Sequence, residues 1–231
     1  MAEPANLVED AQLRNRTAVF RDRQEAGERL AGMLSSGRLP PETLLLAIPA
    51  GGVPVADVIR KRLSFAMDLL VVRKLRIPGN TEAGFGATNL DGKVVLNSPL
   101  VRSLGLGEAE IEAELKRTTR MLEQRESLFR KGRPFPDIEG KAVVLIDDGL
   151  ASGFTMMAAL GYVRKRRPAE VIVAVPTGSY NTILRIAEKA DMIICPNVRE
   201  HYPFAVASAY ARWYDIPDSE VLAVMEERET T

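Results

Sequence analysis

The chain of 231 residues is 46% hydrophobic and 27% charged, which is typical of a folded globular protein and allows one large domain. Its 31 lysines and arginines balance 31 aspartates and glutamates, so no basic excess favours nucleic-acid binding. Apolar runs such as residues 44–50 are too short to cross a membrane, and residues 1–10 lack a secretory-signal pattern. Cys195, the only cysteine, cannot form an internal disulfide, and no Cys/His cluster predicts a zinc site. We expect a soluble, cytoplasmic, single-domain protein.

The spacing of apolar residues predicts helices that alternate with buried strands. In the first half of the chain we expect a helix over 19–35, a strand over 43–48, a helix over 55–63 and a strand over 68–72. A long loop over 73–99, with a weak hairpin near 94–96, precedes a helix over 108–131. The second half predicts strands over 142–146, 171–175 and 192–194, with helices over 155–166 and 182–189. This order predicts an α/β fold: an open, doubly wound, mainly parallel sheet with helices on both faces and ligands at the strands' carboxyl ends.

The strand predicted over 142–146 ends at a motif suited to a phosphorylated sugar. Asp147 and Asp148 follow it, and a loop with glycines and hydroxyl groups over 149–155 then leads into a helix. In such a loop, backbone amides can converge on an anion beside the positive end of the helix dipole. The two carboxylates suit vicinal hydroxyls or a hydrated cation. Together these features predict a phosphorylated sugar with free hydroxyls.

Residues 145–155, which read Leu-Ile-Asp-Asp-Gly-Leu-Ala-Ser-Gly-Phe-Thr, resemble the phosphoribosyl pyrophosphate signature of the type I phosphoribosyltransferases. The resemblance implies that Asp147 and Asp148 bind the ribose hydroxyls and, through water, Mg²⁺. It implies that the ribose and 5′-phosphate site is completed by Gly149, Leu150, Ala151, Ser152, Gly153, Phe154 and Thr155. The implied fold is the doubly wound type I phosphoribosyltransferase fold with a small hood.

The resemblance extends over residues 19–228 and is nearest to a group of uncharacterised bacterial and archaeal phosphoribosyltransferases. The segments that carry it, besides the motif and residues 73–79, are 20–27, 130–134 and 205–210. It implies an N-terminal extension over 1–18 and a single domain over 19–231. Within that domain it implies a mobile loop at about 73–99 and a hood at about 196–214.

Pyrophosphate binding is implied for the loop at the end of the first predicted strand, residues 49–52. Family members bind pyrophosphate there through backbone amides, here those of Ala50, Gly51 and Gly52. They commonly have a non-proline cis peptide bond in this loop, which we expect at Pro49–Ala50 or Ala50–Gly51. The relatives often have an arginine where this chain has Ala50, so the sequence leaves open whether another cation replaces it and whether catalysis is retained.

Residues 73–79 are similar to the start of the mobile catalytic loop of adenine phosphoribosyltransferases. The similarity implies catalytic roles for Arg73, Lys74 and Arg76, with Arg73 and Lys74 also binding pyrophosphate. Such cations, together with Mg²⁺, would stabilise the negative charge that develops on a departing pyrophosphate more than they stabilise the ground state.

The implied activity is that of a glycosyltransferase: it moves the 5-phosphoribosyl group from phosphoribosyl pyrophosphate to a nitrogen acceptor, such as a nucleobase, and releases pyrophosphate. The partners are then small molecules and a second copy of the chain, without nucleic acid or membrane. Ala151 stands where hypoxanthine-guanine enzymes have their general base, which disfavours a 6-oxopurine acceptor. The aromatic residues of 202–214 could stack on the acceptor or pack in the core. The alternative function is a regulator that binds phosphoribosyl pyrophosphate or a nucleotide without catalysis.

Overall fold

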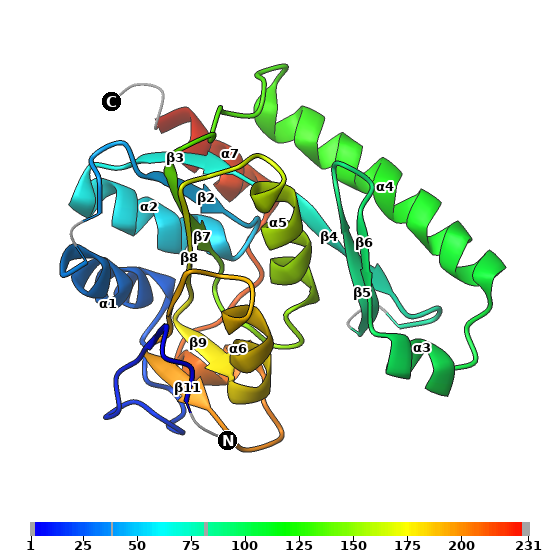
Figure 1. Cartoon of the computed structure of the whole chain (residues 1–231), viewed down its shortest axis with the longest axis horizontal. Helices are drawn as coiled ribbons and strands as arrows, with labels where there is room; N and C mark the ends of the chain where they lie inside the picture. Colours follow the sequence, from blue (N-terminus) through cyan, green and yellow to red (C-terminus); the bar gives the residue numbers. More distant parts are fainter. Residues whose placement is uncertain (1–2, 38, 81–82, 228–231) are drawn as a thin grey trace.

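A six-stranded parallel sheet forms the centre of the fold, with strand order β1-β10-β8-β7-β2-β3 (Figure 1). The computed structural model describes residues 3–37, 39–80 and 83–227. Across the sheet the strands are Leu7–Val8 (β1), Met192–Ile194 (β10), Glu170–Ala174 (β8), Ala142–Ile146 (β7), Leu44–Ala47 (β2) and Ala66–Leu69 (β3). Ala47 pairs with Ile146, so β2 and β7 end at the same level and their following loops start side by side.

Helices cover both faces of the sheet, which confirms the doubly wound α/β prediction. The side chains of β2 alternate between two apolar clusters: Leu46 packs in one cluster and Leu45 in the other. The first cluster includes helices Phe154–Arg164 (α5) and Tyr180–Ala187 (α6). The second cluster includes Arg23–Ser35 (α1), Gly52–Leu63 (α2) and Asp218–Glu227 (α7). Strands that are apolar on both faces explain the continuous apolar runs of the sequence.

The first helix begins four residues later than the sequence predicts. Helix α1 begins at Arg23 because the Asp22 side chain accepts a hydrogen bond from the backbone amide of Glu25, which is the usual way to cap a helix. Upstream, Phe20 forms a parallel bridge with Tyr210 instead of a helical turn. The apolar residue Phe20 therefore pairs with a segment near the other end of the domain instead of extending the helix.

The segment predicted as a long loop over 73–99 contains an antiparallel sheet, so the loop prediction is wrong, although the weak hairpin expected near 94–96 is present. Strands Val72–Arg76 (β4), Gly84–Asn89 (β5) and Val94–Leu96 (β6) form this sheet in the order β4-β5-β6. Helices Ser98–Ser103 (α3) and Glu108–Arg130 (α4) complete an arm beside the main sheet (Figure 1). Phe85 of β5 is 1% exposed and Ala87 is fully buried, and the strand packs against α5. Burial of β5 against α5 explains why a segment rich in Gly, Asn and Thr forms strands.

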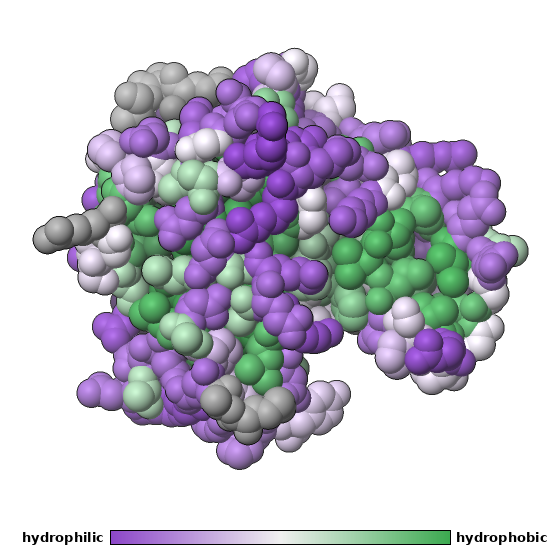
Figure 2. Space-filling view, in the orientation of Figure 1, coloured by the Kyte–Doolittle hydropathy of each residue, from purple (hydrophilic) through white to green (hydrophobic). Residues whose placement is uncertain are grey.

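The arm carries apolar surface. Figure 2 shows hydrophobic side chains gathered over the part of the arm that contains β5, β6 and α3 in Figure 1. All three residues of β6 are half-buried, and Leu104 after α3 is 43% exposed. Contiguous apolar surface of this kind often marks a contact site. Within the described ranges, no helix combines the length and the apolar content needed to span a membrane.

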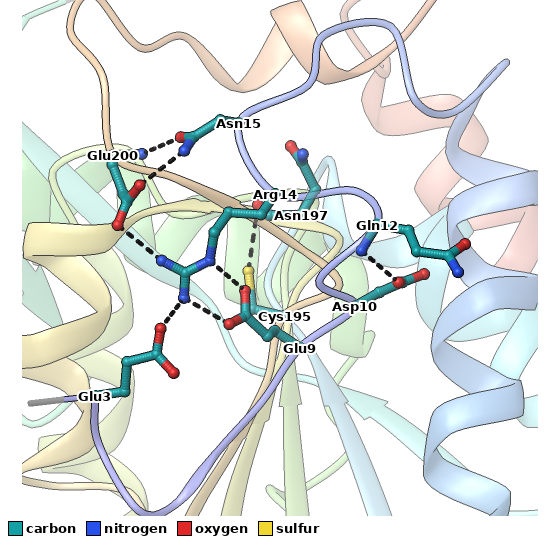
Figure 3. Close-up of polar contacts among 9 residues, drawn as sticks. All are labelled: Glu3, Glu9, Asp10, Gln12, Arg14, Asn15, Cys195, Asn197 and Glu200. Carbon is teal, nitrogen blue, oxygen red and sulfur yellow. Dashed lines mark hydrogen bonds and ion pairs between the residues drawn. The ribbon is translucent and has the colours of Figure 1, made fainter.

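The N-terminal segment is joined to the main fold. Strand β1 pairs with β10 at the edge of the sheet. The Arg14 guanidinium lies among three carboxylates (Figure 3) and donates to Glu200 Oε1 at 2.7 Å, to Glu9 Oε2 at 3.1 Å and to Glu3. Glu200 follows strand Asn197–Arg199 (β11), which pairs with Thr177–Ser179 (β9) in a small second sheet. The residues expected to form an extension therefore complete one edge of the sheet.

Candidate functional site

The loop after β2 and the acidic pair after β7 are in direct contact. A Cβ atom placed on Gly51 would lie 2.0 Å from Asp148 Oδ2, and one placed on Gly52 would lie 2.4 Å from the carbonyl oxygen of Ile146. Only glycine allows the two loops to approach this closely. The Pro49–Ala50 peptide bond is cis, as the resemblance implies. The amide of Gly52 donates to the carbonyl of Ile48 at 3.0 Å, because Gly52 starts α2, so this amide already has a partner within the protein.

The loop over 149–155 leads from β7 into α5. Leu150 is held by backbone bonds, because its amide donates to the Thr177 carbonyl at 2.9 Å and its carbonyl accepts from the amide of Ser179 at 3.0 Å. Gly153 has φ +75°, which favours glycine, and a Cβ atom there would lie 2.4 Å from Thr182 Cγ2. The Leu150 amide therefore already has a hydrogen-bond partner within the protein. The residues after it lead into the start of α5.

Arg185 of α6 lies beside this loop and was not predicted as a site residue. Its Nη2 donates to the carbonyl of Ser152 at 2.9 Å, and its guanidinium carbon lies 5.7 Å from the centre of the Phe154 ring. An exposed guanidinium at the start of α5 adds positive charge to the end of the helix dipole that favours anions. The sequence around Arg185 contains no motif that indicates a site, because α6 follows β9 and the 149–155 loop follows β7.

The carboxylate of Asp148 is paired with a buried arginine that the sequence did not single out. Arg23 is 6% exposed, and its Nε and Nη2 donate to Asp148 Oδ2 at 2.9 and 2.8 Å. The neighbouring carboxylate is held differently, because Asp147 Oδ1 accepts from the backbone amide of Asp148 at 2.9 Å. Burial, followed by the proximity of Asp148, raises the pKa of Asp147 well above its ordinary value. Burial also raises the pKa of Asp148, against the opposing effect of Arg23.

Aromatic residues of the predicted hood surround Arg23. Its guanidinium carbon lies 3.9 Å from the centre of the Trp213 ring, and its Nη1 donates to the carbonyl of Tyr214 at 2.9 Å. Tyr210 is 5% exposed, and its hydroxyl donates to the backbone carbonyl of Asp148 at 2.7 Å. The sequence left two interpretations open for these aromatics. For Tyr210 and Trp213 the structure shows packing around Arg23, whereas Tyr202 is 94% exposed.

The predicted catalytic cations lie on β4 and line the same cavity as parts of both loops. A cavity of about 690 Å³ is lined by Pro49 and Ala50 from one loop, Thr155 from the other, and Arg73, Lys74 and Arg76 from β4. Burial and the nearby guanidinium groups of Arg125 and Arg76 lower the pKa of Arg73. The structure thus brings together the three cations, the first loop and the end of the second loop in one cavity.

Residues 40–210 match the family model of the phosphoribosyl transferase domain, and the match contains both loops and the acidic pair. The chain belongs to this family.

The chain is similar to a named relative and to two solved structures. A protein of Mycobacterium tuberculosis H37Rv, provisionally named a phosphoribosyl transferase, is 37% identical over 210 residues, which are 90% of this chain and 46% of that protein. The chain thus spans less than half of that relative. The crystal structure of TT1426 from Thermus thermophilus is 35% identical with a TM-score of 0.72 and covers 90% of this chain and 98% of its own. The AQ2163 protein of Aquifex aeolicus, at 14% identity and a TM-score of 0.50, covers 87% of this chain and 83% of its own and shares the fold.

The acidic pair of this phosphoribosyltransferase domain suits a weakly held Mg²⁺ ion. Across the part of the chain that the structure describes, no group of three or more His, Cys, Asp or Glu side chains converges on one point. Mg²⁺ is nevertheless often bound through one or two carboxylates, with water and substrate phosphates as its other ligands. Because Arg23 occupies Asp148 Oδ2, Asp147 and the remaining oxygen of Asp148 are the donors that fit such an ion.

Proposed function

We propose that this domain transfers the 5-phosphoribosyl group from phosphoribosyl pyrophosphate to a nitrogen acceptor, a nucleobase or a related compound, and releases pyrophosphate. The contact of the 49–52 loop with Asp148 is the observation that carries the proposal. It supports a site in which the ribose hydroxyls and the pyrophosphate of one molecule lie at neighbouring strand ends. The 35% identity to TT1426 over 90% of this chain supports the same fold for the whole domain, and the sequence motif supplies the ligand class.

In the proposed reaction the bond from ribose C1 to pyrophosphate breaks and a bond from C1 to the acceptor nitrogen forms. Positive charge develops on the ribose ring, and Asp147 and Asp148, which hold its hydroxyls, stabilise that charge. Negative charge develops on pyrophosphate, where Arg73, Lys74 and Arg76 act together with the amides of Ala50 and Gly51. Mg²⁺, when bound, would neutralise part of the phosphate charge.

Residue 151 is alanine, so no carboxylate at this position can accept the proton that the acceptor nitrogen releases. Ala151 is exposed and has no titratable group. An acceptor that reacts without a strong base at this place, or one that supplies its own anionic nitrogen, suits the site better than a 6-oxopurine. The remaining residues of the proposed ribose and phosphate site are Gly149 and Ser152 to Thr155, and Gly52 and Leu150 shape the two loops.

The proposed partners are phosphoribosyl pyrophosphate, a small nitrogen compound and a second copy of the chain, in the cytoplasm. The apolar surface of the arm in Figure 2 supports a homodimer. The single cysteine, Cys195, is buried, which suits a reducing compartment. Equilibrium sedimentation measures the molecular mass, and a mass near 25.4 kDa at all concentrations would exclude the dimer.

The proposed activity is tested by measuring pyrophosphate release from phosphoribosyl pyrophosphate and Mg²⁺ in the presence of bases and amines. The double variant Asp147→Asn, Asp148→Asn should bind phosphoribosyl pyrophosphate at least about tenfold more weakly, or about 1.4 kcal/mol. The matched control Glu123→Gln changes an exposed carboxylate on α4. Equal affinity of the double variant and the control, measured by calorimetry, would refute the assignment of the acidic pair.

A regulator without catalysis is the second candidate, and Ala50 favours it. The uncharacterised group that the sequence resembles often has an arginine at this position, and a loop without that charge binds pyrophosphate through amides alone unless other cations contribute. The two candidates differ in turnover. A protein that binds phosphoribosyl pyrophosphate with micromolar affinity but releases no pyrophosphate with any acceptor would be a regulator.

A further inference from the structure

Arg125 of α4 lies on the wall of the cavity that faces the two loops. The cavity contacts Pro49, Ala50 and Thr155 on the loop side, and Gln124 and Arg125 on the α4 side. Helix α4 packs against β4 and α7 (Figure 1), so it carries Arg125 to the cavity from a part of the chain that no motif marks. The α4 side therefore brings one more cation to the place where the three cations of β4 also lie.

Positive charge exceeds negative charge in this cavity. Among the described residues, its lining contains four cations, the three of β4 and Arg125, and one carboxylate, Asp218. The pKa of Arg73 is lowered by burial and by the charges of Arg125 and Arg76, which means that these groups repel one another. A multiply charged anion would relieve that repulsion.

Arg125 has an incomplete set of hydrogen bonds in this structure. Its Nη2 forms an ion pair with Asp218 at the start of α7, and its guanidinium carbon lies 5.0 Å from the centre of the Phe129 ring. Its Nε atom is buried and has no hydrogen-bond partner among the described residues. The Asp218 side chain is 43% exposed, and ion pairs with an exposed partner contribute about 0–1 kcal/mol. A phosphate oxygen can therefore replace Asp218 at low cost.

We propose that Arg125 binds the diphosphate group of the ligand and that Asp218 is the counterion which the diphosphate displaces. The proposal rests on the function proposed above and adds a residue to its leaving-group site. It also supplies a cation that compensates for Ala50, because Arg125 and the 49–52 loop line the same cavity. Asp218 then opposes diphosphate binding, because its charge repels the anion and must leave Arg125.

Two substitutions with opposite expected signs test this proposal. Arg125→Gln should raise the Kd for pyrophosphate with Mg²⁺ about tenfold, because a charged partner is lost. Asp218→Asn should lower the same Kd by roughly threefold, because the competing charge is removed. The matched controls Arg120→Gln on α4 and Asp215→Asn near α7 change exposed residues outside the cavity and should leave the Kd unchanged. Isothermal titration calorimetry measures the Kd of the wild type and of these four variants.

The outcomes separate this proposal from the proposed function. If Arg125→Gln binds pyrophosphate as tightly as Arg120→Gln while the wild type binds both pyrophosphate and ribose 5-phosphate, the role of Arg125 is refuted and the function stands. If both Arg125→Gln and Asp218→Asn weaken binding, the pair is a structural clamp and the proposal is refuted. If Arg125→Gln alters only the KM of the acceptor, the cation serves the acceptor instead, which also refutes the proposal. A wild type that binds neither ligand refutes both proposals.

Discussion

Arg23 determines which carboxylate oxygens of Asp147 and Asp148 remain available in the proposed ribose site. Its two donors occupy Asp148 Oδ2, and the Trp213 ring covers the guanidinium. The second oxygen of Asp148 and the carboxylate of Asp147 then remain for hydroxyl groups. The pairing also places a positive charge beside two carboxylates that burial would otherwise disfavour in the ionised form. Arg23 is therefore a positioning residue of the proposed site, although it need not touch the ligand.

Replacing Arg23 tests this role. Arg23→Met should lower the free energy of unfolding by about 3 kcal/mol, because it leaves the Asp148 carboxylate, which is only 15% exposed, without its ion-pair partner. Arg23→Lys keeps the charge but not the paired donors, so it should recover part of that loss. The control Arg21→Met changes a side chain that is 63% exposed. Urea unfolding measures the three variants, and an Arg23→Met protein as stable as the control would contradict the role.

At the scale of single residues, the sequence revealed the groups that lie close together in the chain. Asp147, Asp148 and the loop after them form one continuous motif, and the structure keeps them together at the end of β7. Arg23 and Arg125 were missed because their partners lie 125 and 93 residues away, which no local pattern encodes. The family resemblance did include residues 20–27, which contain Arg23. That resemblance indicated no chemical role for the arginine.

The sequence-based prediction of helices and strands failed mainly in the arm, where it missed strands β4 and β5. The apolar run 68–72 predicted one strand, but β3 ends at Leu69 and β4 begins at Val72 in a different sheet. No glycine or proline marks this change of sheet, so apolar pattern alone could not reveal it. In β5, Gly86 is required because a Cβ atom there would lie 2.4 Å from the carbonyl oxygen of Val95. Close strand packing therefore selected the same residue types that usually indicate a loop.

The turn between β5 and β6 is tied to the main domain by an ion pair that depends on pH. Asp91 Oδ1 lies 3.1 Å from Arg166 Nη2, just after α5. Arg166 and then Lys165 lower the pKa of Asp91. Because the folded pKa is lower than the unfolded value of about 3.9, the stabilisation is present above that value and is lost as pH falls through the folded pKa.

Asp91→Asn should therefore lower the free energy of unfolding by about 0.5 kcal/mol near pH 7, which is the size expected for a pair close to the surface. The difference from the wild type should shrink as the pH falls below about 4. Urea unfolding at pH 7 and below about pH 4 measures this difference. The matched control is Glu42→Gln, which changes an exposed residue. A difference that stays constant across this pH range would show that Asp91 acts through shape and not through charge.

For the whole molecule, the N-terminal segment closes the edge of the main sheet beside β10. Asn6 Nδ2 donates to the carbonyls of Ala187 and Ala190 at 3.0 and 2.9 Å, and Asn15 donates to Glu200 at 2.7 Å (Figure 3). An exposed edge strand offers unpaired backbone groups to other chains. The two-residue strand β1 is therefore the edge of the sheet in place of β10, and so short an edge strand offers few unpaired backbone groups to other chains.

A chain that lacks residues 1–15 should have a lower Tm and should associate on heating, because β10 becomes the edge of the sheet. The variant Arg14→Gln provides the control, since it removes the ion pairs but keeps β1 paired with β10. It should lower the Tm by a smaller amount without association. Differential scanning calorimetry with light scattering measures both effects. A shortened chain that melts like Arg14→Gln and stays dispersed would rule out edge protection.

The surroundings of Asp148 also determine when the proposed ribose site can form during protein synthesis. Arg23 comes from the start of the chain and Asp148 from the middle, while Trp213 and Tyr214 come close to its end, with 191 residues between the Arg23 donor and the Tyr214 carbonyl. A nascent chain leaves the ribosome from its N-terminus. Until residues 213 and 214 have been synthesised, the Arg23–Asp148 pair has no aromatic cover and no Tyr214 carbonyl. A ligand of the proposed site can therefore stabilise this domain only after that point of synthesis.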